Sequence, residues 1–146
     1  PYAGPDEWAA VHVPIGEGRL VRDGDDVLLA TWGNGLHLAL RAARRLAADG
    51  VSCRVFDLRW LAPLPVDQLV RHAAEVGRVL VVDETRHAGG VGEGVVSALV
   101  ERGVDATVRR LAAVDSFVPL GDAANLVLVS VDQIVDAVHG LHGHER

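Results

Sequence analysis

Short apolar runs alternate with amphipathic stretches along most of this chain, and this alternation restricts the fold more than any other feature. Four runs have the length and composition of buried strands, at residues 27–32, 51–58, 79–82 and 106–111. Between them apolar residues recur at helical spacing, as in Leu36, Leu40, Ala43 and Ala47. Strands that alternate with helices are typical of a mostly parallel sheet with helices on both faces. The sequence therefore predicts an α/β three-layer sandwich.

The sequence predicts irregular structure at the start of the chain and a well-defined helix near its end. Residues 1–18 contain three prolines and three glycines, which predict an extended arm or incoming linker before a domain over residues 19–146. Asp23-Gly24-Asp25 predicts a turn between a first strand and the run at 27–32. Ser130 and Gln133 have capping-box spacing and predict the start of the last helix. The chain contains no Met, so we expect it to be a piece of a longer protein.

Composition narrows the classes of function. Apolar residues make up 49% and charged residues 23%, and no apolar run approaches the ~18 residues of a membrane span, so we expect a globular domain and no membrane partner. The net charge of −6 argues against nucleic-acid binding, which needs a basic surface. Cys53 lies in an apolar run and is expected to be a buried, reduced thiol, which favours a cytoplasmic setting.

A glycine-rich turn follows the run at 27–32 and leaves two interpretations open. Gly33-Asn34-Gly35 before a helix, with Asp57 about twenty residues later, resembles part of a dinucleotide-binding fingerprint. The third glycine position of that fingerprint holds Leu38. A tight turn from strand to helix needs glycines without any ligand, so a stand-alone nucleotide-binding module is the alternative function and a structural turn is the favoured interpretation.

The segment Asp83–Gly92 is the best local site candidate. It follows a buried strand at the edge where α/β proteins bind ligands, and it combines carboxylates, an imidazole and flexible backbone. The candidate residues are Glu84, His87, Gly89, Gly90 and Gly92. His87 could act as an acid or base near neutral pH, although the sequence shows no neighbouring nucleophile. A catalytic or substrate contact and a structural or interface loop both remain open.

Two further groups of residues are candidates for binding. Asp57-Leu58-Arg59 joins a strand to a proline-rich loop, where Arg59 either clasps Asp57 or reaches a second subunit through its planar guanidinium. Histidines cluster near the C-terminus, where they either bind a metal or belong to a mobile tail. They are His139, His142 and His144.

Taken in order, several segments resemble the C-terminal domain of transketolase-like thiamine-diphosphate enzymes. The resemblance is greatest to the β-subunit of the decarboxylating component of 2-oxoacid dehydrogenase complexes and runs from about Val13 to Val138. The segments that carry it are Pro14-Ile15-Gly16, Gly18-Arg19, Trp32-Gly33, residues 39–43, Asp57-Leu58-Arg59, Pro63-Leu64, Gly77-Arg78, Asp83-Glu84, residues 89–92 and Ile134-Val135.

This resemblance implies a mixed five-stranded sheet whose first strand is antiparallel to the others, and a homodimer. It also implies that thiamine diphosphate and Mg²⁺ are held by two other domains of the full enzyme, with no cofactor, metal or catalytic residue in this one. The reaction would be decarboxylation of a 2-oxo acid with acyl transfer to a lipoyl group. A 1-deoxyxylulose-5-phosphate synthase or a transketolase is the alternative within the same group.

The resemblance further implies docking to the acyltransferase core of a multienzyme complex through the face near the last helix. Acidic residues in the last third of the chain would attract a basic partner if the fold gathers them on one surface. These residues are Asp115, Asp122, Asp132 and Asp136. Asp132 and Asp136, in the last helix, are the candidates for contact with the partner. The simpler interpretation is that Asp132 favours the N-terminus of the helix electrostatically while the others are solvated.

Overall fold

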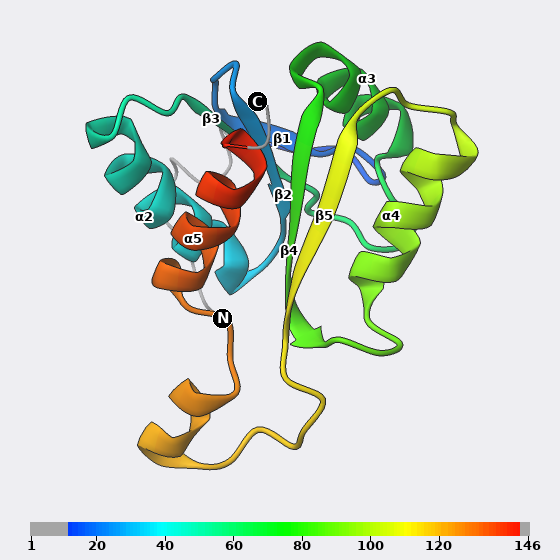
Figure 1. Ribbon diagram of the computed structural model, residues 1–146. Coiled ribbons are helices and arrows are strands. Elements are labelled where there is room, and N and C mark those ends of the chain that lie inside the picture. Colours follow the sequence, from blue (N-terminus) through cyan, green and yellow to red (C-terminus); the bar gives the residue numbers. More distant parts are fainter. Residues whose placement is uncertain (1–11, 144–146) are drawn as a thin grey trace.

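The computed structural model describes residues 12–143, and a single five-stranded sheet forms its centre. The strands lie in the order β1-β3-β2-β4-β5 (Figure 1). Strands β2 to β5 run parallel to one another, whereas β1 pairs antiparallel with β3, which confirms the predicted mixed sheet. The bounds are β1 (Arg19–Arg22), β2 (Val27–Thr31), β3 (Cys53–Asp57), β4 (Arg78–Arg86) and β5 (Thr107–Ala113).

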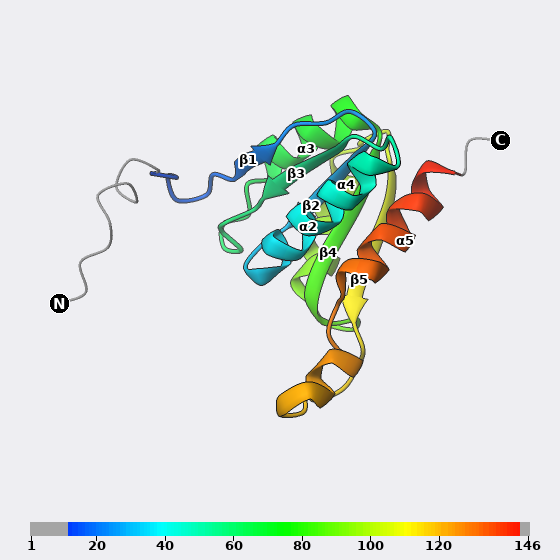
Figure 2. The same ribbon diagram turned by 90° about the vertical axis from the view of Figure 1, so that its left-hand side faces the viewer.

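Two helices cover each face of the sheet. Helices α2 (Asn34–Ala48) and α5 (Val131–His142) pack together on one face. Helices α3 (Val66–Val76) and α4 (Val91–Glu101) lie on the other, so the predicted three-layer sandwich is confirmed (Figure 1). A short 3-10 helix, η1 (Gly121–Leu126), follows β5 and projects away from the layers (Figure 2).

The central strands are apolar along their whole length because both of their faces are covered. Every residue of β2 is fully buried. Side chains that point toward α2 and α5, such as Leu29 and Val55, form one core cluster with these helices. Side chains that point the other way, such as Leu28 and Phe56, form a second cluster with α3 and α4. This is the expected pattern for a parallel sheet between two helical layers.

The turn after β1 does not form a hairpin, because β3 lies between β1 and β2. The chain passes the start of β3 closely at Gly24, where an added Cβ would lie 2.4 Å from the carbonyl carbon of Cys53. Arg54 Nε donates a hydrogen bond of 3.0 Å to the carbonyl oxygen of Gly24. Gly24 is therefore required by the crossing of two backbones.

Helix α5 begins with the predicted capping box. The backbone N–H of Gln133 donates to the Ser130 hydroxyl, and the backbone N–H of Ser130 donates to the Gln133 side chain. Within the described part of the chain, residues 121–142 are long and apolar enough to cross a membrane, with a mean hydropathy of 1.2. In the fold these residues form two separate helices, and the apolar stripe of α5 is buried in the core formed with α2 and the sheet. We therefore assign α5 to the core.

The connections diverge between β2 and β4, which places a topological switch point there. From β2 the chain passes through α2 to β3 on one side, and from β4 it passes through α4 to β5 on the other. Loops that leave adjacent strand ends in opposite directions leave a crevice at the carboxyl edge of the sheet, where open α/β sheets bind ligands. The residues predicted as site candidates around positions 33, 59 and 84 lie near the carboxyl ends of β2, β3 and β4, respectively.

Candidate functional site

The loop after β4 is organised by the buried carboxylate of Asp83. One of its oxygens, Oδ1, accepts hydrogen bonds from the backbone N–H and from the hydroxyl of Thr85, at 2.8 and 2.7 Å. The other, Oδ2, accepts a bond of 2.7 Å from the backbone N–H of Gly92, in the first turn of α4. A carboxylate at a helix N-terminus is stabilised by the unpaired N–H groups and by the helix dipole. Asp83 therefore ties the end of β4 to the start of α4.

The glycines of this loop are required by the space around Asp83. An added Cβ at Gly92 would lie 2.7 Å from Asp83 Oδ2 and 2.8 Å from Arg110 Cδ. An added Cβ at Gly90 would lie 2.4 Å from the Thr85 hydroxyl oxygen. Gly89 has a φ of 72°, which side chains disfavour. The three glycines are thus explained by close packing and backbone conformation without a ligand.

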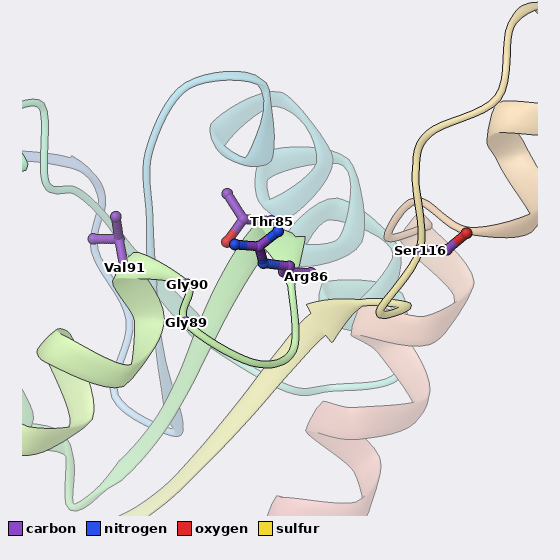
Figure 3. A pocket seen from close by; sticks show the side chains of 6 residues that line it. All are labelled: Thr85, Arg86, Gly89, Gly90, Val91 and Ser116. Carbon is purple, nitrogen blue, oxygen red and sulfur yellow. The ribbon is translucent and has the colours of Figure 1, made fainter.

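Two further carboxylates hold the outer part of the loop. Asp115, just beyond β5, accepts a hydrogen bond of 2.9 Å from the backbone N–H of Ala88. Glu93 accepts one of 3.2 Å from the backbone N–H of Gly89. The loop borders a hollow of about 350 Å³, which Figure 3 shows between Thr85, Arg86 and Val91 on one side and Ser116 on the other. His87 is exposed on this loop.

Glu84 and Arg59 lie near the carboxyl ends of β4 and β3, at the same edge of the sheet but on either side of β2. Glu84 Oε1 accepts a hydrogen bond of 2.7 Å from Asn34 Nδ2, which links the ends of β4 and β2 across the switch point. Arg59 has a φ of 57°, and its backbone N–H donates to Asp57 Oδ1 at 3.0 Å. Its guanidinium lies 3.8 Å from Asp57 Oδ2 and stays half exposed. The Asp57–Arg59 clasp is thus present, and it leaves the guanidinium accessible.

The turn Gly33–Gly35 is also explained by its own surroundings. Gly33 has a φ of 57° before α2. At Gly35 an added Cβ would lie 2.3 Å from the Thr31 hydroxyl oxygen, which donates to the carbonyl oxygen of Val82. Asp57, the acidic residue of the partial fingerprint, is buried and bonded to the backbone of Arg59. These contacts favour the structural turn over the nucleotide-binding module.

The acidic and histidine candidates of the C-terminal helix differ in their partners. Asp132 forms an ion pair of 2.5 Å with Arg45 of α2. Asp136 is exposed, and no ion pair with it is found among residues 12–143. His139 lies 3.4 Å from Asp49, His142 is exposed on α5, and His144 lies outside the described residues. Residues 12–143 contain no group of three or more His, Cys, Asp or Glu that could hold a metal ion.

This arrangement provides a rigid, polar strand-end surface. The one hydroxyl bonded to a carboxylate within the described loop is that of Thr85, and its partner Asp83 also holds two backbone N–H groups. Cys53 is buried, as predicted. Burial raises the pKa of its thiol to about 11, which opposes formation of a reactive thiolate. The position of the loop was predicted from the sequence, but the role of Asp83 in holding it was not. The spacing of Asp83 and Thr85 is a turn signal, because an Asp side chain bonds the backbone two residues on.

Known proteins resemble most of this chain. The family model for the transketolase C-terminal domain matches residues 16–134. Pyruvate dehydrogenase E1 component subunit beta of Staphylococcus aureus is 34% identical over 127 residues, as is that of Staphylococcus epidermidis. In both cases the match covers 85% of this chain and 39% of the relative, so the chain spans about two fifths of the length of these relatives.

Two solved structures share the fold. A split gene transketolase, described as an inactive beta4 tetramer, superposes with a TM-score of 0.82 at 27% identity, covering 93% of this chain and 44% of that one. A 2-oxoglutarate:ferredoxin oxidoreductase from Magnetococcus marinus superposes with a TM-score of 0.61 at 18% identity, covering 94% of this chain and 21% of that one, and supports the fold alone. With its antiparallel first strand, its switch-point loops and a family match over most of its length, this chain belongs to the family of transketolase C-terminal domains.

Proposed function

We propose that this chain is the assembly and partner-docking domain of a thiamine-diphosphate-dependent 2-oxoacid dehydrogenase. The observation that carries the proposal is the 34% identity to pyruvate dehydrogenase E1 β-subunits over 85% of the chain. The site supports the same conclusion, because the backbone N–H groups of its loop are bonded within the domain, to Asp83, Glu93 and Asp115. A loop occupied in this way suits a rigid contact surface better than a reaction centre.

The residues of the described part do not fit a thiamine diphosphate and Mg²⁺ site. Mg²⁺ takes oxygen ligands in near-octahedral geometry, and the carboxylates of the strand-end edge are engaged with backbone N–H groups or with Asn34. We infer that the cofactor and its metal are held by other parts of the enzyme, which also select the 2-oxo acid. Residues 1–18 would then be the linker or arm that leads into the domain over residues 19–146.

The test compares the isolated chain with the complete enzyme that contains it. The complete enzyme is expected to oxidise a 2-oxo acid in a thiamine-diphosphate-dependent reaction, measured by reduction of an acceptor dye and by acylation of lipoyl domains. The isolated chain is expected to bind no thiamine diphosphate by calorimetry and to show no turnover. Turnover by the isolated chain, or failure of the complete enzyme to use any 2-oxo acid, would contradict the proposal.

A second candidate function rests on the split gene transketolase, whose structure superposes with a TM-score of 0.82. In this case the parent enzyme would transfer two-carbon ketol units between sugar phosphates, or act as a 1-deoxyxylulose-5-phosphate synthase. Acylation of lipoyl domains distinguishes the candidates, because neither ketol transfer nor 1-deoxyxylulose-5-phosphate synthesis passes an acyl group to a lipoyl group.

Self-association and docking to an acyltransferase core complete the proposed role in the cytoplasm. Arg59 and Glu84 lie at the carboxyl edge of the sheet, and the exposed guanidinium of Arg59 can make paired hydrogen bonds to a second subunit. Arg59→Ala should weaken dimerisation of the complete enzyme in sedimentation experiments. Unchanged dimerisation would show that Arg59 is not part of the interface. It would not bear on the activity of the parent enzyme, which the assays above test separately.

A further inference from the structure

The outward face of helix α2 carries positive charge and no negative charge. Arg41 and Arg44 are exposed, three residues apart, on the side of the helix opposite its buried residues. No Asp or Glu occurs within residues 34–48. We define the basic stripe as Arg41 and Arg44. The residues that α2 buries are Gly35, Ala39, Ala42, Ala43 and Leu46.

The charges along the seam between α2 and α5 are balanced, whereas those of the basic stripe are not. The two helices pack side by side on one face of the sheet (Figure 1). Asp132 of α5 forms an ion pair of 2.5 Å with Arg45 of α2. Asp49, just beyond α2, lies 3.4 Å from His139 of α5. No ion pair with the basic stripe is found among residues 12–143, so its two charges are available to an external partner.

Folding does not explain the basic stripe. Like charges three or four residues apart on a helix repel each other, and Arg41 has Arg44 and Arg45 at these spacings. A cation gains from the helix dipole within the last turn, where Arg45 is the basic residue. Arg41 and Arg44 precede that turn. The stripe therefore adds little to the stability of the domain by itself, and an anion bound across it would relieve the repulsion.

The surroundings of the basic stripe favour one class of anion. The described residues include several exposed large apolar side chains, and none of them lies on α2, although a helix that binds membranes needs such side chains. The net charge of −6 opposes the approach of nucleic acids and of a second copy of the chain. A short carboxylate-rich polypeptide segment meets less of this repulsion, and arginine makes paired hydrogen bonds to carboxylates.

We propose that the basic stripe of α2 binds an acidic segment of a partner protein, with Glu or Asp carboxylates of the segment accepting hydrogen bonds from the Arg41 and Arg44 guanidinium groups. The proposal holds for any substrate of the parent enzyme. It adds a basic surface beside the acidic residues of α5, so a partner that spans both helices must carry charges of both signs. Because the contact is exposed and polar, it is reversible and sensitive to salt.

The test uses an alanine-based helical peptide of about 20 residues, with glutamates three and four residues apart, and a matched peptide with glutamine in their place. Fluorescence anisotropy at low ionic strength should show that the chain binds the glutamate peptide more tightly than the glutamine peptide. Arg41→Gln with Arg44→Gln should raise the dissociation constant by about fivefold or more. Added salt should weaken binding by the wild type.

The matched control removes two charges from exposed arginines elsewhere. Arg19→Gln with Arg71→Gln changes β1 and α3 by the same net charge and should leave peptide binding nearly unchanged. Equal losses in the two double variants would assign binding to net charge and overturn the proposal. The same result follows if the wild type binds the two peptides equally.

Two further measurements separate the remaining explanations. Urea unfolding of the stripe variant should show unchanged or slightly higher stability, because repulsion within α2 is relieved. A loss of stability would assign the arginines to folding and overturn the proposal. DNA duplexes, phosphatidylglycerol vesicles and sedimentation of the chain alone test the other occupants. Binding or self-association that the stripe variant loses, without any binding of the glutamate peptide, would overturn the proposal in favour of that occupant.

Discussion

At the scale of single residues, the two glycines at the start of α4 occupy different surroundings. Gly92 lies against Asp83 and Arg110, whereas Gly94 has nothing within 4 Å of an added Cβ. Both are helical, so alanine costs no backbone strain at either position. The difference between them therefore isolates the effect of space around Asp83.

Gly92→Ala is expected to destabilise the domain by about 1–3 kcal/mol, because the added methyl group displaces the buried carboxylate or the Arg110 stem. Gly94→Ala is the matched control and should stabilise it by about 0.5–1 kcal/mol through helix propensity. The free energy of unfolding in urea measures both. Equal effects of the two substitutions would show that the Asp83 carboxylate is not closely enclosed.

His72 makes stability depend on pH. It lies 4.9 Å from the Phe56 ring, between centroids, and within 3.3 Å of Arg54. Burial, followed by the charge of Arg54, lowers the pKa of His72 from its usual 6.5; Arg71 acts in the same direction, while Glu75 and Asp23 oppose it. Below pH 6.5 the unfolded chain therefore binds a proton at this residue more readily than the folded chain, and stability falls as pH decreases toward the lowered pKa.

His72→Gln should consequently reduce the loss of stability between neutral pH and the range just below the usual histidine pKa. His87→Gln, at an exposed histidine, serves as the control. Between the two pH values, this variant should lose as much stability as the wild type loses. The measurement is the urea midpoint at both pH values. An undiminished loss in the His72 variant would assign the pH dependence to other groups.

At the scale of elements, the sequence predicted the order of strands and helices because apolar periodicity is local. The sequence could not place β1 beside β3, since that pairing depends on a close crossing at Gly24. Neither η1 nor the exposed apolar segment before it, residues 114–120, was predicted from the sequence. Phe117 and Leu120 have the composition of core residues, and their exposure follows from how the chain leaves β5.

The candidate loop likewise has features that the local sequence predicts and features that it does not. Its position after a buried strand and its glycines were apparent, but the bond from Gly92 to Asp83 spans nine residues and depends on how α4 packs. The pairing of Asp115 with Ala88 joins residues 27 apart. Contacts between distant residues of this kind give no periodic signal, so they could not be predicted from one sequence.

The capping box of α5 provides a prediction at this scale. Ser130→Ala removes the acceptor for the backbone N–H of Gln133 and should lower the free energy of unfolding by about 1 kcal/mol. Ser97→Ala, on the exposed face of α4, should change stability little or raise it slightly. Thermal and urea unfolding of the two variants give the comparison. A loss in Ser97→Ala as large as in Ser130→Ala would argue against the cap as the cause.

At the scale of the whole molecule, the two candidate docking carboxylates of α5 differ in their partners. Asp132 is paired with Arg45 of the same chain, so part of its charge is already balanced. Asp136 is exposed, with no ion pair found among the described residues. An unbalanced surface charge contributes most to attraction of an oppositely charged partner and to the rate of encounter. If α5 docks a basic domain of an acyltransferase core, Asp136 should therefore matter more than Asp132.

Asp136→Asn is expected to weaken association of the complete enzyme with its acyltransferase by about two- to fivefold, as for one exposed charge pair. The loss should shrink at moderate ionic strength, because salt screens exposed charges. Asp132→Asn should have a smaller effect, and Glu101→Gln, which removes one negative charge on the opposite face, should have none. Binding of all four proteins to the acyltransferase, measured by calorimetry at low and moderate salt, decides between these outcomes. Equal binding by Asp136→Asn and the wild type at low salt would remove α5 from the docking surface and leave it as the helix that covers the core beside α2.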